Sequence, residues 1–290
     1  MNNKSIDKKM GFVCAYFNPC RFEARFENYM VFKERFAESG ITLITVEAAI
    51  GGQDFELEET DSVIRRRSDS LIWHKEALLN IGIQQLLESG YENVGWIDAD
   101  VAFLNDDWAT NVREGLESAT LLQCFSKAVM SYTDRSYWAK GSAAEIIQTG
   151  TSTTPATGGA WIAHRKLLTP SLLFPFCIVG SFDMALIGGL VGGLHNSFLG
   201  YGDGFRRELS RWVESFSGMS QLGYAENDLV FMSHGKLEDR KYSKRHDLVS
   251  GFDPEIHLKK NQDKLYEWVT GCSYVQPVKN YFVERDEDSV

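Results

Sequence analysis

Two carboxylates stand two residues apart in the stretch GWIDADVAFLNDDW, where Asp98 and Asp100 follow a short apolar run. Like charges at the end of a buried strand repel each other and resist desolvation, so we expect a compensating group beside them. Carboxylate oxygens suit Mg²⁺ or Mn²⁺, which often bind through one or two carboxylates together with substrate phosphates. Aspartate is also common in surface turns, which is the alternative for a bare Asp-x-Asp. The apolar run before Asp98 favours the metal.

A lysine and a histidine elsewhere could share such a site. Trp73 and Lys75, in IWHKEALLN, are predicted in the first turns of the preceding helix, and helix N-termini favour anions such as phosphate. A solvated lysine beside Glu76 is the more common outcome for that pattern. His234 follows an apolar run and could complete a metal shell, although a lone histidine is more often a core or surface residue. We expect such structural positions for the other five, which are His74, His164, His195, His246 and His257.

One acid interrupts the almost uncharged stretch over residues 167–202. Asp183 stands there among glycines and apolar residues, and Pro170 and Pro175 break the run, so the stretch does not predict a membrane-spanning helix. A buried carboxyl group needs partners, and two explanations stay open. Either Ser181 or Asp183 caps the following helix, or Asp183 is a catalytic acid or base.

Alternating strands and helices predict how these residues are positioned. Apolar, β-branched runs predict strands over residues 11–17, 41–50 and 93–97. The spacing of apolar residues between them predicts helices over residues 22–40 and 68–90. Ser68, Asp69 or Ser70 is expected to cap the second helix. This order predicts an α/β fold, in which ligands gather at the carboxyl ends of the strands. Residues 145–159 are small, polar and glycine-rich, and predict a mobile loop that could cover the site.

Composition narrows the class of protein. The chain has 290 residues, 43% of them hydrophobic, and a net charge of −10, which disfavours binding to nucleic acid or an anionic membrane. Five scattered cysteines without a CxxC pair indicate reduced thiols in a cytoplasmic protein, and the N-terminal residues do not resemble a signal peptide.

Several short motifs, in order along nearly the whole chain, carry a family resemblance. They are YFNP, VEAAIGG, IWHKEALLN, GWIDADVAFLNDDW, GGAWIAHRKLL, GSFDMALIG, HGKLEDRKYSKR, GFDPEIHL and YFVERDED. Together they resemble the GT-A class of nucleotide-sugar glycosyltransferases, closest to a bacterial and phage-type group with a DxD motif. The resemblance implies a Rossmann-like, mixed but mainly parallel sheet flanked by helices. It implies a GT-A domain over residues 1–235, with an irregular C-terminal extension over 236–290 packed on it.

The resemblance also implies roles for single residues. Asp100 would bind Mn²⁺ or Mg²⁺ directly, Asp98 would contact the ribose or a metal-bound water, and His234 would be a further ligand. Asp183 would lie near the acceptor hydroxyl, although Phe182 stands where a small residue is expected. Nucleoside or diphosphate contacts would come from Tyr16, Asn18, Glu47, Trp73, Lys75, Arg240 and Arg245. Sugar or acceptor contacts would come from Gly158, Gly159 and Trp161.

The implied reaction is hexosyl or pentosyl transfer from a UDP- or GDP-sugar to an acceptor hydroxyl. The acceptor could be a glycan, a lipid-linked saccharide, a protein or a modified DNA base. DNA stays among the alternatives because the basic residues between Lys236 and Arg245 could contact its phosphates. One alternative is a sugar nucleotidyltransferase, but the stretch YFNPCRFEARF lacks the glycine-rich basic loop expected after its first strand. The other alternative is a non-catalytic carbohydrate-binding protein.

Overall fold

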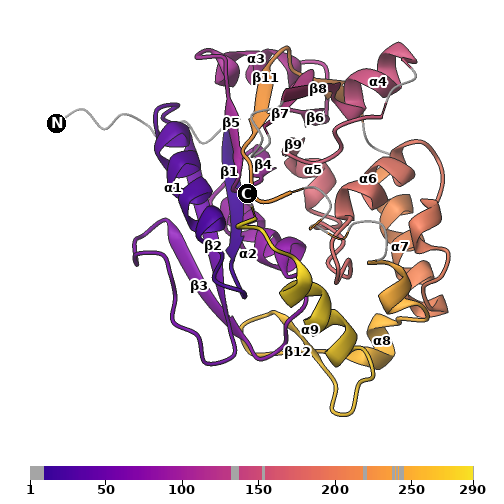
Figure 1. Cartoon of the computed structure of the whole chain (residues 1–290). Helices are drawn as coiled ribbons and strands as arrows, with labels where there is room; N and C mark the ends of the chain where they lie inside the picture. The colour runs from indigo at the N-terminus through magenta and orange to yellow at the C-terminus, as the bar shows by residue number, and fades with distance from the viewer. Residues whose placement is uncertain are drawn as a thin grey trace.

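A central sheet runs through the molecule (Figure 1). The computed structural model describes residues 10–131, 137–151, 154–217, 221–236, 239, 241 and 245–289. The strands of this sheet are β1 (Met10–Phe17), β2 (Thr42–Ile50), β3 (Val63–Ser68), β4 (Asn93–Ile97), β6 (Leu121–Gln123), β9 (Ala160–His164) and β10 (Leu222–Tyr224). Their order is β10-β6-β9-β4-β1-β2-β3. Neighbouring strands are parallel except where β9 pairs with β4 and with β6.

Helices cover both faces of this sheet, and further helices pack beyond it in the C-terminal half of the chain. They are α1 (Glu23–Ala37), α2 (Lys75–Glu88), α3 (Trp108–Gly115), α4 (Ala143–Thr149), α5 (Arg165–Leu168), α6 (Phe182–Leu190), α7 (Asp203–Ser217), α8 (Pro254–His257) and α9 (Val275–Glu284). Strand β1 is buried on both faces because its side chains alternate. Phe12 joins the core under α1 and α3, whereas Val13 joins the core under α2. The predicted α/β fold with a mixed, mainly parallel sheet flanked by helices is therefore confirmed.

A second sheet brings distant polar residues together. It contains β5 (Val101–Phe103), β7 (Lys127–Ser131), β8 (Tyr137–Gly141) and β11 (Asp228–Phe231), in the order β5-β11-β7-β8. Strands β5 and β11 are antiparallel, with Val101 opposite Phe231. Asp100, which precedes β5, therefore lies beside the residues that follow β11, and the Met232 amide donates to its carbonyl oxygen at 2.7 Å. A separate hairpin joins β12 (Leu258–Lys260) to β13 (Tyr266–Trp268).

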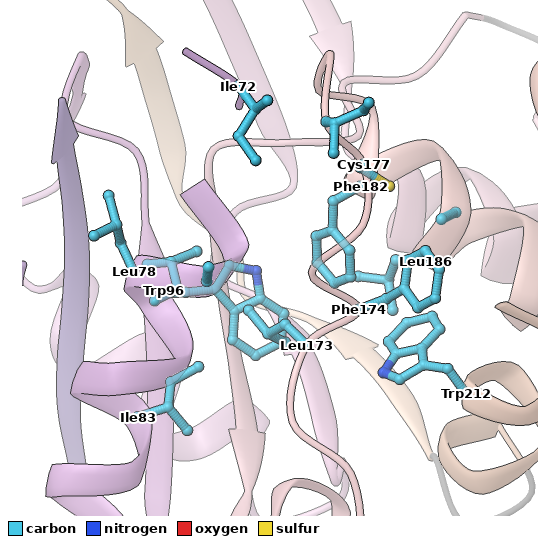
Figure 2. Close-up of a cluster of buried hydrophobic side chains, with 14 of the residues drawn as sticks. Ile72, Leu78, Ile83, Trp96, Leu173, Phe174, Cys177, Phe182, Leu186 and Trp212 are labelled. Carbon is cyan, nitrogen blue, oxygen red and sulfur yellow. The ribbon is translucent and has the colours of Figure 1, made fainter. Parts of the chain in front are cut away.

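A buried cluster ties the sheet to the C-terminal half of the chain (Figure 2). Trp96 of β4 and Leu78 of α2 lie on one side of it, and Phe182 and Trp212 lie on the other, with Leu173 between them. Phe182, the bulky residue that departs from the family pattern, is 4% exposed and packs edge-on against the ring of Trp212 at 5.5 Å. Its size therefore has a packing function at the start of α6.

The structure corrects two predicted elements. Helix α2 begins at Lys75 instead of residue 68, because Ser68 is the last residue of the strand β3. The sequence of β3, VIRRRS, is too polar to show the apolar run that predicts a strand. None of the proposed caps is used, and Ser70 instead accepts from the Trp268 amide at 2.9 Å. Residues 145–149 are not loop but part of α4, which Ser142 caps by accepting from the Glu145 amide. In the part of the chain that the structure describes, no helix is both long and apolar enough to cross a membrane.

Candidate functional site

Two cavities meet at the carboxyl end of β4. The smaller has a volume of about 170 Å³ and the larger about 440 Å³. Both are lined by Trp73, Lys75, Asp98, Asp100 and His234. The family resemblance had implied that these five residues share one site, and the structure brings all five together.

Asp98 is held between a cation and a backbone amide. Its carboxylate forms an ion pair with the ammonium of Lys75, and the Gly159 amide donates to its Oδ2 at 3.2 Å. Burial alone would lower the pKa of Lys75, but the carboxylates of Asp98 and Glu76 raise it above its ordinary value. Burial raises the pKa of Asp98, and Lys75 opposes that rise. Lys75 therefore carries its charge inside the site and is not the solvated lysine of the alternative interpretation.

Asp100 forms a chain of polar contacts with two later residues. Its Oδ2 lies 2.8 Å from Nε2 of His234, and Nδ1 of the same ring lies 3.5 Å from Oε2 of Glu287. Glu287 is 1% exposed. Burial would raise its pKa, but Arg25 and Arg285, with the His234 hydrogen bond, hold it well below the usual range. Glu287 is thus an ionised acid that can fix the orientation of the imidazole.

Glu287 is a site residue that the sequence search missed, although the motif YFVERDED contains it. Arg25 binds both of its oxygens, with Nη2 at 2.7 Å from Oε1, and Nη2 of Arg285 lies 2.8 Å from the same atom. The Arg285 guanidinium also lies 5.2 Å from the ring centroid of Trp73. The C-terminal end of the chain therefore forms one wall of the smaller cavity, close to the sheet where Figure 1 marks it.

The three residues expected near a nucleoside have different positions. Tyr16 lines the smaller cavity and donates to Oε2 of Glu56 at 2.6 Å. Asn18 lines neither cavity and bonds in both directions with the backbone of Phe22. Glu47 is also outside both cavities, 2% exposed, and accepts from the Glu56 and Leu57 amides. Asn18 also donates to Oε1 of Glu56 at 3.3 Å, so Asn18 and Glu47 both support Glu56, the residue that binds Tyr16.

Asp183 also lines the larger cavity, beside the pair Asp98 and Asp100. A Cβ atom added at Gly158 would lie 3.4 Å from Oδ2 of Asp98 and 3.8 Å from Oδ2 of Asp183, so both carboxylates flank this glycine. Thr157 donates from its hydroxyl to Asp183, and the indole of Trp161 donates to the Thr157 carbonyl at 2.9 Å. Gly158, Gly159 and Trp161 all line the cavity.

The helix-capping explanation for Asp183 does not hold. Ser181 is the N-cap of α6, its side chain makes no capping hydrogen bond, and the carboxylate of Asp183 faces Thr157 in the cavity. Arg245 lines the same cavity, where its Nη1 would lie 3.2 Å from a Cβ atom added at Gly180. Arg240 lies outside the described residues.

Asp100 and His234 satisfy a simple test for a divalent cation. Two ligands at right angles on an ion with bonds of 2.0–2.1 Å are about 3 Å apart, close to the 2.8 Å between Oδ2 and Nε2. Glu287 on the far side of the imidazole matches the carboxylate that commonly orients a metal-binding histidine. Among the described residues, no three or more His, Cys, Asp or Glu side chains are grouped to hold a metal. Further ligands would therefore have to be water or substrate oxygens.

The only similarities found between this chain and known proteins are to solved structures. No protein-family model and no curated protein matches the chain. A mutant Drosophila beta-1,4-galactosyltransferase 7 in complex with manganese, UDP-Gal and xylobiose shares 11% identity over 93% of this chain and 98% of that chain, with a TM-score of 0.43. A glycosyltransferase involved in glycosylation of the major capsid of PBCV-1 shares 12% identity over 94% and 98%, with a TM-score of 0.34.

The bifunctional IspDF from Campylobacter jejuni shares 11% identity over 75% of this chain and 49% of that chain, with a TM-score of 0.35. Because all three TM-scores are below 0.5, the activity of this chain has to be argued from its own side chains.

Proposed function

We propose that this protein is a metal-dependent glycosyltransferase that uses a nucleoside-diphosphate sugar. One observation carries the proposal: Asp98 and Asp100 follow β4 at the junction of two cavities, and Asp183 lines the larger of them beside the same glycine, Gly158, that Asp98 flanks. The smaller cavity would take the nucleoside of a UDP- or GDP-sugar, beside Tyr16. The larger cavity would take the sugar and the acceptor.

The metal and phosphate groups of such a donor would lie where the two cavities meet. Asp100 and His234 would hold Mn²⁺ or Mg²⁺, and Glu287 would keep the imidazole oriented. A bound divalent cation would supply positive charge next to the departing diphosphate. Lys75, already charged through its contact with Asp98, would also neutralise that diphosphate, together with Arg245, which lines the larger cavity.

Asp183 would serve the acceptor. The acceptor oxygen forms a bond to the anomeric carbon of the sugar while the bond from that carbon to the diphosphate oxygen breaks. The hydroxyl proton passes to the carboxylate of Asp183, and the diphosphate leaves with the electron pair. Thr157 would fix the carboxylate through its hydrogen bond, and Trp161 would support Thr157 through the bond from its indole to the Thr157 carbonyl. We propose a hydroxyl of a glycan or of a lipid-linked saccharide as the acceptor.

The extension over residues 236–290 belongs to this proposal as well. Because Arg285 and Glu287 line the smaller cavity, we expect the extension and the domain over residues 1–235 to act as one unit.

Calorimetry with UDP and GDP, in the presence and absence of Mn²⁺, tests the proposal. We expect one nucleotide to bind in a Mn²⁺-dependent way, and Asp100→Ala to remove that binding. Asp106→Ala is the matched control, because this exposed aspartate lines neither cavity. Unchanged binding in Asp100→Ala would refute the metal role. If the protein instead condensed a nucleoside triphosphate with a sugar phosphate, the nucleotidyltransferase alternative would be correct.

A further inference from the structure

A serine with an unusual backbone conformation precedes Asp183. Ser181 has a φ of 80°, in the left-handed region that residues other than glycine rarely adopt. It is 6% exposed and lines the larger cavity. Such a conformation persists only where surrounding contacts hold it, and it is common at functional sites.

The side chain of Ser181 contacts His246, 65 residues later in the chain. Nε2 of His246 lies 3.1 Å from the Ser181 hydroxyl, and Nδ1 lies 3.0 Å from the hydroxyl of Tyr201, which is 2% exposed. The imidazole also packs edge-on against Phe198, with ring centroids 5.5 Å apart. Both ring nitrogens have a hydrogen-bond partner and the ring packs against Phe198, so the imidazole has one orientation.

The backbone of Ser181 sets the direction of α6. The amides of Met184 and Ala185 both donate to the Ser181 carbonyl, at 3.1 and 3.2 Å, and these bonds form the first turn of the helix. Asp183 lies within that turn, with its carboxylate on Thr157. A change in φ at Ser181 would rotate this carbonyl and move the first turn, so the position of the Asp183 carboxylate depends on the conformation of Ser181.

We propose that His246 is a positioning residue for Asp183: by holding Ser181 in its left-handed conformation, it places the carboxylate in the larger cavity. This inference rests on the proposed function, in which Asp183 accepts the proton of the acceptor. His246 had been expected to have a structural position only. A purely structural histidine would support the stability of the fold, whereas a positioning histidine also determines the rate of transfer.

A pair of substitutions separates these two roles. In His246→Ala, Ser181 loses the contact that holds its φ, and we expect kcat for transfer to fall by about 10- to 100-fold, as misplacement of a catalytic group does. Affinity for the nucleoside diphosphate with Mn²⁺ should stay within about 2-fold, because Ser181 and His246 do not line the smaller cavity. Adding Ser181→Gly to His246→Ala should restore kcat to within about 3-fold of the wild type, since glycine adopts a φ of 80° without strain.

His164→Ala is the matched control, since His164 caps α5 and lines neither cavity. It should lower the melting temperature without lowering kcat. A wild-type kcat in His246→Ala, or no recovery in the double variant, would overturn the inference.

Crystal structures of His246→Ala and of the double variant with Ser181→Gly test the inference without an activity assay. The inference requires Ser181 to leave the left-handed region in His246→Ala, with loss of the Thr157–Asp183 hydrogen bond, and requires Ser181→Gly to restore both. Unmoved Ser181 and Asp183 in His246→Ala would overturn it even if no transfer reaction were found. Absence of any nucleotide binding in the wild type would instead count against the proposed function.

Discussion

Glu76 should make the stability of this protein depend on pH in an unusual direction. The residue is 1% exposed at the start of α2 and borders the larger cavity, and among the described residues its Oε2 has no hydrogen-bond partner. Burial raises its pKa from 4.5 to about 8, with Lys75 opposing the rise and the carboxylates of Asp183 and Asp98 adding to it. The folded protein therefore binds a proton at Glu76 that the unfolded chain releases at neutral pH.

The sign and size of the effect follow from this difference. A raised pKa in the folded state means that the stabilisation is fully present below pH 4.5 and is lost as the pH rises through about 8. Within that window the free energy of unfolding should fall by about 1.4 kcal/mol per pH unit, and by at most about 5 kcal/mol in total. Glu76→Gln has the shape of the protonated acid and no titration, so it should match the wild type near pH 5 and be more stable than the wild type at pH 8.

Urea denaturation at pH 5, 6, 7 and 8 measures these free energies for the wild type and Glu76→Gln. Glu88→Gln is the control, because Glu88 is exposed near the other end of α2. Its curve should parallel that of the wild type, whereas the curve for Glu76→Gln should be flatter. Parallel curves for Glu76→Gln and the wild type would refute the claim that Glu76 is protonated in the folded protein at neutral pH.

Three further substitutions test the site and the core. Glu287→Gln should lower the free energy of unfolding by about 3–5 kcal/mol in urea denaturation, because it removes the carboxylate from the Arg285 guanidinium, which is 2% exposed; unchanged stability would contradict the buried ion pair. Asp183→Asn should keep donor affinity within a few-fold and reduce transfer by about 100-fold in steady-state kinetics, and a near-normal kcat would exclude Asp183 as the base. Gly95→Ala should cost about 1–3 kcal/mol in thermal denaturation, since its Cβ would lie 2.2 Å from the ring of Phe12, and an unchanged melting temperature would show that this ring can move.

The sequence by itself determined the class of fold and one half of the site. Apolar runs placed β1, β2 and β4, and the helical spacing between them placed α1 and most of α2, because these elements bury continuous or periodic apolar faces. The carboxylates of Asp98 and Asp100 could then be placed at a strand end. The apolar pattern did not predict β3, because its successive arginines interrupt the run; among the described strands, β3 pairs with β2 alone.

Only the tertiary structure decided which charges meet. Arg25 and Glu287 are 262 residues apart in the chain and form a partly buried ion pair, and Asp100 meets His234 because β5 pairs with β11. Local propensity acts over a few residues, whereas these contacts depend on the packing of whole elements, which brings segments together regardless of their separation in sequence. The conformation of Ser181, and with it the orientation of Asp183, depends on His246 in the same way, so the sequence could name this acid but not the contacts that position it.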